Sequence, residues 1–170
     1  MGKLMYFPIY GRAEPSRMIL NHAGVKFEDS HVQMADWGKV KPTVPGNTLP
    51  IWVEEDGTML GESAAICQAL ARKHGFAPQG FLGEWANSYV FDITNDCNLE
   101  GFRPKLFGAV DEESVKKWVE AQHKLNAAIE RHLTVTDMKF CAGDNLTASD
   151  FWLITFYTDI PLNKNCAKNV

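Results

Sequence analysis

The sequence predicts an α/β domain followed by an all-α helical domain. Three observations lead to this prediction. Short apolar runs and helical patterns alternate at first, in the order strand, helix, strand, loop, hairpin, helix. A connector rich in proline and glycine, "FAPQGFLG", comes next, and helical periodicity follows it. We therefore expect a first domain at residues 1–76, a linker at 77–83 and a helical domain at 84–170.

The first strand and helix are predicted from an apolar run and the pattern that follows it. Residues 3–7 read as a short buried strand. Residues 13–23 carry apolar side chains at helical spacing, and Pro15 suits the first turn, where a missing N–H needs no partner. Gly24 supplies a stop signal. Residues 25–32 alternate well enough for a second strand.

The rest of the first domain is predicted as a loop, a hairpin and a helix. Residues 33–47 contain several glycine and proline breaks and read as loop. Residues 48–60 form a hairpin around Asp56–Gly57, a strong turn signal between two apolar arms. Residues 62–75 form a helix that Ser63 can cap.

The helical domain is predicted in three parts. Residues 84 to 107 form one helix or two, and residues 111–133 form an amphipathic helix with an acidic start. Its apolar face comprises Val115, Trp118, Val119, Gln122, Leu125, Ile129 and Leu133. Residues 146–157 open with a capping box in which Thr147 caps and Asp150 reciprocates, flanked by a staple of Leu146 and Phe151.

Composition and charge exclude several classes of function. The chain has 170 residues, 45% of them hydrophobic, and a net charge of −4 without a basic block, so nucleic acid and anionic membranes are poor partners. No signal peptide and no apolar run of about 18 residues is seen. The cysteines (67, 97, 141 and 166) lack metal-binding spacing, so we expect free thiols in the cytoplasm and no metal.

Two features near the start of the sheet could bind a ligand. Tyr6 lies at the end of a strand, one loop before the helix start that carries Arg12, where α/β folds place ligand groups. Taken alone, such a tyrosine is usually a buried core aromatic. Pro50 precedes a strand and suggests a cis bond, which would leave the backbone of Leu49 to pair with an extended peptide. An ordinary trans proline is the alternative.

Two further features could bind carboxylates. Ser63 stands at a helix N-terminus, which binds carboxylate well, although a plain cap is the alternative. Trp37 and Lys41 offer two donors on one loop, although a half-buried tryptophan in a solvated loop is the alternative. Together, the four features describe a site for a small extended peptide with a carboxylate at each end and an anionic centre. Glutathione fits that description.

The chain resembles the cytosolic glutathione transferases, and within them the sigma class, the haematopoietic prostaglandin D synthase and S-crystallin group. The matching stretches are "LMYF", "GRAE--R", "ADW--VK", "LPI", "DGTML-ES", "AI" and "LTASDF". The resemblance implies a thioredoxin-like domain plus a helical domain, a dimer, and transfer of glutathione to a small hydrophobic electrophile in detoxification.

The resemblance also implies roles for the residues around the sulfur of glutathione. Tyr6 would donate its hydroxyl to the sulfur and hold it as thiolate, and Arg12 would add positive charge nearby. Leu49 would pair its backbone with the cysteinyl unit ahead of cis-Pro50. A hydrogen bond to a charged group is worth about 1.5–3 kcal/mol, so Tyr6 alone could lower the pKa of the thiol by about one to two units.

For the two ends of glutathione, the resemblance implies further contacts. Trp37 and Lys41 would hold the glycine carboxylate, and Glu62 with Ser63 would hold the γ-glutamyl end. Asp96 would reach the γ-glutamyl amine of the ligand in a neighbouring subunit.

The sequence departs from the family pattern in three places. Glu62 stands where the sigma class usually has glutamine. Residues 97–107 are unlike the aromatic pocket of the prostaglandin synthase. The sequence stops soon after residue 157, where the family normally adds helices, so the helical domain looks shortened. A transferase-like structural or binding subunit of a larger assembly, with little or no catalysis, is therefore the alternative hypothesis.

Overall fold

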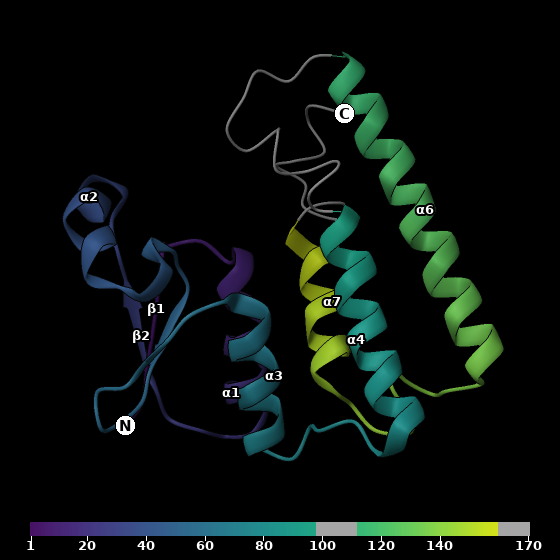
Figure 1. Ribbon diagram of the computed structural model, residues 1–170, viewed down its shortest axis with the longest axis horizontal. Coiled ribbons are helices and arrows are strands. Elements are labelled where there is room, and N and C mark those ends of the chain that lie inside the picture. Colours follow the sequence, from purple (N-terminus) through teal and green to yellow (C-terminus); the bar gives the residue numbers. More distant parts are fainter. Residues whose placement is uncertain (98–111, 160–170) are drawn as a thin grey trace. The chain divides into compact units, whose positions relative to one another are not determined.

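The computed structural model describes residues 1–97 and 112–159 (Figure 1). The chain divides into two compact units between Ala77 and Pro78, and each unit is described here by itself. Among the helices in the described ranges, none is both long enough and apolar enough to cross a membrane.

The first unit is built on a four-stranded mixed sheet with the order β2-β1-β3-β4. Strand β1 (Lys3–Tyr6) pairs in parallel with β2 (Glu28–His31) and antiparallel with β3 (Ile51–Val53). Parallel neighbours require a crossover connection, and α1 (Glu14–His22) supplies it. The element order confirms the predicted α/β domain.

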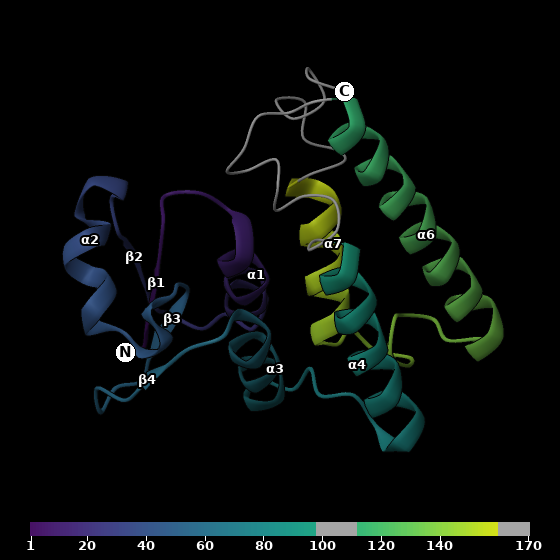
Figure 2. The same cartoon turned by 45° about the horizontal axis from the view of Figure 1, so that its top comes forward.

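The predicted hairpin is confirmed at the other edge of this sheet. Strand β4 (Met59–Leu60) pairs antiparallel with β3, and Figure 2 shows the two strands next to each other. Gly57 has a φ of +90°, which suits glycine, and the N–H of Thr58 donates to Oδ1 of Asp56 at 2.9 Å. The turn chemistry therefore follows directly from the Asp56–Gly57 pair.

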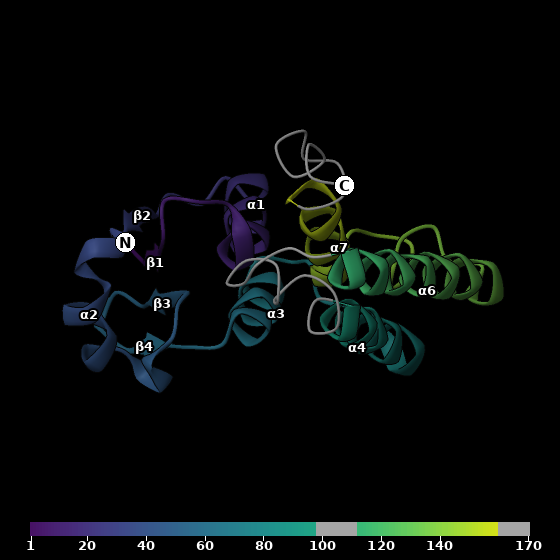
Figure 3. The ribbon, with the colours of Figure 1, turned by 90° about the horizontal axis from the view of Figure 1, so that it is seen from above.

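Helices cover both faces of the sheet (Figures 1 and 3). Helix α1 lies beside α3 (Ser63–Lys73) on one face, and α2 (Trp37–Val40) lies on the other side. Pro15 falls in the first turn of α1, as predicted. The core of this unit includes the buried side chains Leu4, Ile19, Leu20, Ile51, Ile66 and Leu70.

The prediction of an open loop at residues 33–47 is wrong. This segment forms α2 and three single 3-10 turns, at Met34–Asp36, Lys41–Thr43 and Pro45–Asn47. Turns of three or four residues are too short to produce apolar periodicity, which explains why the pattern gave no helical signal. Both prolines of the segment, Pro42 and Pro45, occupy the first turn of a 3-10 segment rather than breaking the chain there.

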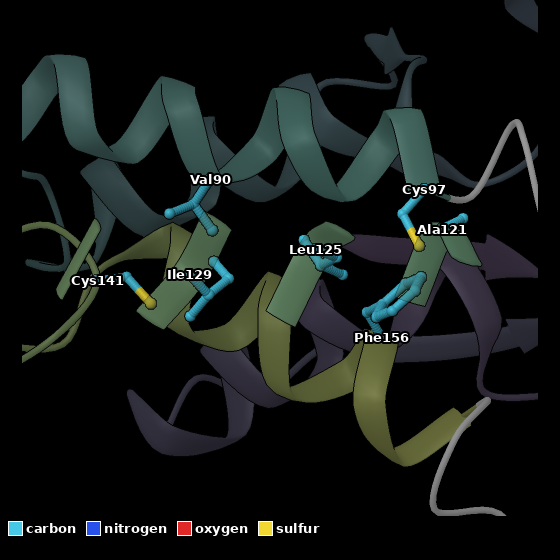
Figure 4. Close-up of a cluster of buried hydrophobic side chains, with 7 residues drawn as sticks. All are labelled: Val90, Cys97, Ala121, Leu125, Ile129, Cys141 and Phe156. Carbon is cyan, nitrogen blue, oxygen red and sulfur yellow. The ribbon is translucent and has the colours of Figure 1, made fainter. Parts of the chain in front are cut away.

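The second unit packs three described helices around one apolar cluster. Helix α4 (Gly80–Cys97) packs against both α6 (Glu112–Thr136) and α7 (Ala148–Asp159). Figure 4 shows the cluster, with side chains from all three helices directed toward one another. Its buried members are Val90, Cys97, Ala121, Leu125, Ile129, Cys141 and Phe156.

Helix α4 begins at Gly80, inside the predicted linker, so the predicted start at residue 84 is wrong. The glycines and prolines of this connector predict a break in the chain. A Cβ on Gly83 would lie 3.0 Å from the carbonyl oxygen of Ala142, so this glycine permits close packing within a helix. The part of the predicted helix after Cys97, including the stretch compared with the prostaglandin synthase pocket, lies outside the described residues.

The predicted capping box at the start of α7 is confirmed in its main feature. Oδ2 of Asp150 accepts the N–H of Thr147 at 2.8 Å, as predicted. The hydroxyl of Thr147 donates to the same carboxylate at 2.8 Å rather than accepting from the helix backbone. Asp150 also accepts the N–H of Cys141 through Oδ1 at 2.9 Å. The carboxylate thus joins the helix start to the preceding loop.

Candidate functional site

The candidate site begins where β1 ends. Tyr6 is the last residue of that strand and its side chain is 8% exposed. The backbone N–H of Arg12 donates to the Tyr6 hydroxyl oxygen at 3.3 Å. Gly11 makes this approach possible, because its φ is +46° and a Cβ there would lie 2.9 Å from the same oxygen. The turn therefore brings the start of the next segment directly onto the phenol.

The Arg12 side chain links this turn to the first residue of α3. Nη1 of Arg12 donates to Oγ of Ser63 at 3.4 Å, and Ser63 is buried while Arg12 is exposed. The structure thus brings together Tyr6, Arg12 and Ser63 from three parts of the first unit.

The predicted role of Ser63 as the helix cap is wrong. The residue at the N-cap of α3 is Glu62, which makes no side-chain cap hydrogen bond, and Ser63 is already helical. Glu62 has a φ of +67°, a left-handed conformation that is uncommon for a residue with a side chain. Its side chain is exposed. Backbone strain of this kind concentrates at ligand-binding positions, so this turn is a feature of the candidate site.

The predicted cis proline is confirmed, since the bond between Leu49 and Pro50 is cis. Pro50 is buried and stands directly before β3. Leu49 is half-buried.

The two predicted donors of the 33–47 segment lie on successive helical turns. Trp37 is the first residue of α2, and Lys41, which is exposed, begins the next 3-10 turn. The ring of Trp37 meets the ring of Phe7 edge-on, with centroids 5.6 Å apart. The ring of Phe7 lies at the same distance from that of Tyr6. An aromatic row therefore leads from Tyr6 to Trp37.

The remaining predicted residue belongs to the second unit. Asp96 is exposed near the end of α4. Its assigned role toward the ligand of a neighbouring subunit stays a prediction.

Arg17 contacts the loop of the candidate site, although the sequence predicts no role for it. It lies on α1 and is 8% exposed, and its Nη1 donates to the carbonyl oxygens of Ile9 and Tyr10 at 3.0 and 3.1 Å. Those carbonyls belong to the loop between Tyr6 and Arg12. The signal available in the sequence is an arginine at helical spacing from the apolar residue Leu20, on the face of α1 that the structure buries.

The described cysteines do not offer a nucleophile. Burial raises the pKa of the Cys67 thiol, and burial together with the carboxylate of Asp150 raises the pKa of the Cys141 thiol. Cys97 is buried and accepts a hydrogen bond from Gln122. Among the residues that the structure describes, no group of three or more His, Cys, Asp or Glu side chains could hold a metal ion.

The geometry suits an anion that arrives from outside. A phenol and a guanidinium are both hydrogen-bond donors, and charge-assisted bonds from such groups are among the strongest in proteins. The guanidinium of Arg12 contacts Ser63, the first residue of α3, where the helix dipole also favours negative charge.

Comparisons with known proteins identify the family to which the chain is similar. A family model described as "Glutathione S-transferase, N-terminal domain" matches residues 13–73. The "Glutathione S-transferase class-mu 28 kDa isozyme" of Schistosoma japonicum is 51% identical over 164 residues, covering 89% of this chain and 77% of the relative. "Glutathione S-transferase 1" of Ascaris suum is 36% identical over 155 residues, covering 87% of this chain and 74% of the relative.

Solved structures show the same likeness. The structure of "a major nematode C.elegans specific GST" matches with a TM-score of 0.86 at 29% sequence identity. The match covers 96% of this chain and 82% of that one.

Proposed function

The chain belongs to the glutathione S-transferase family, and from this premise we propose that Tyr6 holds the sulfur of bound glutathione as a thiolate that attacks a small hydrophobic electrophile. The observation that carries the proposal is the contact between the Arg12 amide and the Tyr6 hydroxyl oxygen. An oxygen that accepts a hydrogen bond becomes a better donor through its own hydrogen, because hydrogen bonds in a chain polarise one another.

The size of the effect is sufficient for catalysis near neutral pH. A free cysteine thiol has a pKa of about 8.5. A hydrogen bond to the charged sulfur is worth about 1.5–3 kcal/mol, which lowers that pKa by about one to two units. We also assign to Arg12, whose guanidinium donates to Ser63 at 3.4 Å, an added positive charge near the sulfur. The thiol therefore ionises without a general base.

The rest of the peptide is held by the residues around this centre. We assign the backbone of Leu49, next to the cis bond, to the cysteinyl unit, and Trp37 with Lys41 to the glycine carboxylate. Glu62 and Ser63 take the γ-glutamyl end, at the N-terminus of α3. These assignments are supported by residue chemistry and by the family pattern.

An apolar electrophile is supported by the loop that follows Tyr6. Ile9 leaves 56% of its surface exposed only three residues after the phenol. An exposed aliphatic side chain beside a reactive sulfur favours apolar over charged second substrates. A homodimer in which Asp96 meets the ligand of the neighbouring subunit completes the proposal.

The test is glutathione conjugation to a generic aryl halide, with Tyr6→Phe compared with Tyr10→Phe. Tyr10 lies on the same loop, but its side chain is 66% exposed, so losing that hydroxyl leaves the rate at the wild-type level. Tyr6→Phe lowers kcat/KM at least tenfold, because one charge-assisted hydrogen bond exceeds about 1.4 kcal/mol.

Other outcomes would redirect the proposal. Equal rates for the two phenylalanine variants would show that Tyr6 does not stabilise the thiolate. A wild-type protein that is retained on immobilised glutathione but conjugates nothing would be a glutathione-binding protein without transferase activity.

A further inference from the structure

Arg17 is a buried cation that the proposed reaction leaves without a role. Its side chain is 9% exposed, so its charge needs partners, because a desolvated charge is costly unless it is paired. Nε donates to Oδ2 of Asp29, at the edge strand β2, at 2.9 Å. Nη1 donates to Oε2 of Glu14, on α1, at 3.0 Å.

The same guanidinium also holds the loop between Tyr6 and Arg12. Nη1 donates to the carbonyl oxygens of Ile9 and Tyr10 at 3.0 and 3.1 Å. The side chains of these two residues are 56% and 66% exposed, so they contribute little packing of their own. Arg17 therefore ties the backbone of an otherwise exposed loop to α1 and β2.

The loop that Arg17 holds also carries the Arg12 N–H, whose contact with the Tyr6 hydroxyl supports the thiolate in the proposed mechanism. Only Gly11 separates the carbonyl of Tyr10 from the N–H of Arg12, which donates to the Tyr6 hydroxyl oxygen. Gly11 adopts a φ of +46°, a conformation that few other residues share. Movement of the Tyr10 carbonyl is therefore transmitted through a single residue to the amide.

We propose that Arg17 is a positioning residue for the thiolate, because it fixes the turn that sets the Arg12 amide against the Tyr6 hydroxyl. The inference rests on the proposed role of Tyr6. Arg17 has no assigned contact with the sulfur and acts only through the loop. Its loss would widen the range of positions that the Tyr6–Arg12 contact can adopt.

The experiment measures the ionisation constant of the thiol in bound glutathione, from the ultraviolet absorbance of the thiolate as the pH is raised. The variants are Arg17→Met and Arg17→Lys. Methionine fills much of the same volume without a charge, and Glu14 and Asp29 are 22% and 34% exposed, so water can reach them. Lysine keeps the charge but lacks the planar fork that holds several acceptors at once.

In Arg17→Met, we expect the ionisation constant of the bound thiol to fall about tenfold, the effect of losing about 1.4 kcal/mol of thiolate stabilisation. Arg17→Lys should change the ionisation constant in the same direction. If Arg17→Met does not fold, the Arg17→Lys result alone tests the inference. In the Arg17 variants, we expect the rate of conjugation to be lower than in the wild type at pH values below neutral and to recover at high pH. A control, Lys73→Met, breaks the exposed ion pair with Glu54 in the same unit and leaves the ionisation constant unchanged.

Folded Arg17 variants with the wild-type ionisation constant would overturn the inference, even if their melting temperature fell. The Tyr6→Phe variant separates this failure from that of the proposed function. If Tyr6→Phe also keeps the wild-type constant, the Tyr6 mechanism fails and the inference fails with it. If Tyr6→Phe weakens ionisation and neither Arg17 variant does, only the inference on Arg17 fails.

Discussion

Replacing Gly11 with alanine tests whether the close approach at the Tyr6 hydroxyl matters for activity. The added Cβ would lie 2.9 Å from the hydroxyl oxygen and 3.1 Å from Cε1 of the same ring. Ordinary van der Waals contact begins at 3.4 Å, so the phenol or the turn must shift by about half an ångström. The residue also has a φ of +46°, which costs a residue with a Cβ about 1–2 kcal/mol.

The matched control is Gly24→Ala. Gly24 has a similar φ of +67°, but a Cβ there would meet nothing within 4 Å. Both variants therefore carry the backbone strain, and both should lose about 1–2 kcal/mol of stability in thermal denaturation. Only Gly11→Ala displaces the Tyr6 hydroxyl.

The assay is kcat/KM for glutathione conjugation at neutral pH. We expect Gly11→Ala to lose about tenfold or more, because misplacing a catalytic group by a fraction of an ångström weakens its charge-assisted hydrogen bond. Gly24→Ala keeps the wild-type value. Equal activities in the two variants, whether both high or both low, would refute the reasoning that the contact at Gly11 positions the phenol.

Two further predictions concern stability. Asp150→Ala removes the acceptor for Thr147 and Cys141 and should destabilise the protein by about 2–3 kcal/mol, whereas Asp144→Ala, at an exposed position of the same loop, should change the melting temperature little. An unchanged melting temperature in Asp150→Ala would contradict this account. Lys73 lowers the pKa of the Glu54 carboxyl, so the stability from this pair is present above the usual glutamate range and is lost as the pH falls through the lowered pKa. Both side chains are substantially exposed, so Lys73→Met should reduce the loss of stability at acidic pH by less than about 1 kcal/mol. If stability at acidic pH changes in the same way as in the wild type, the pair contributes nothing.

The strands and long helices could be predicted because their signals are local. Pro15 and Gly24 mark the two ends of α1, and Asp56 with Gly57 specifies the hairpin turn. The buried face of α6 also follows from its spacing, as the burial of Leu125 and Ile129 confirms. The family was identified from short motifs, and the comparisons confirm it, while the sigma class stays a prediction.

The errors arose where a residue type has two structural uses. Gly83 predicts a break, yet it lies within α4, where the backbone of Ala142 approaches closely. The prolines of the 33–47 segment lie in the first turn of short 3-10 segments rather than ending them. Ser63 has the chemistry of a cap, but its hydroxyl accepts from Arg12 instead.

The candidate site was predicted residue by residue, but not its connections. The bond between Arg12 and Ser63 joins positions 51 residues apart, and such a pairing depends on tertiary packing rather than on spacing. The four contacts of Arg17 likewise come from a loop, a helix and a strand. One sequence shows that an arginine is present but cannot show which carbonyls it reaches.

The most direct test of the central claim is a titration of the thiol in bound glutathione, in the wild-type protein and in Tyr6→Phe, under identical conditions. Thiolate absorbance in the wild type should appear about one to two pH units below that of free glutathione, the effect of one charge-assisted hydrogen bond. In Tyr6→Phe, most of that difference should disappear while glutathione stays bound. A bound thiol that ionises at the same pH in both proteins would contradict the assignment of Tyr6 as the group that stabilises the thiolate.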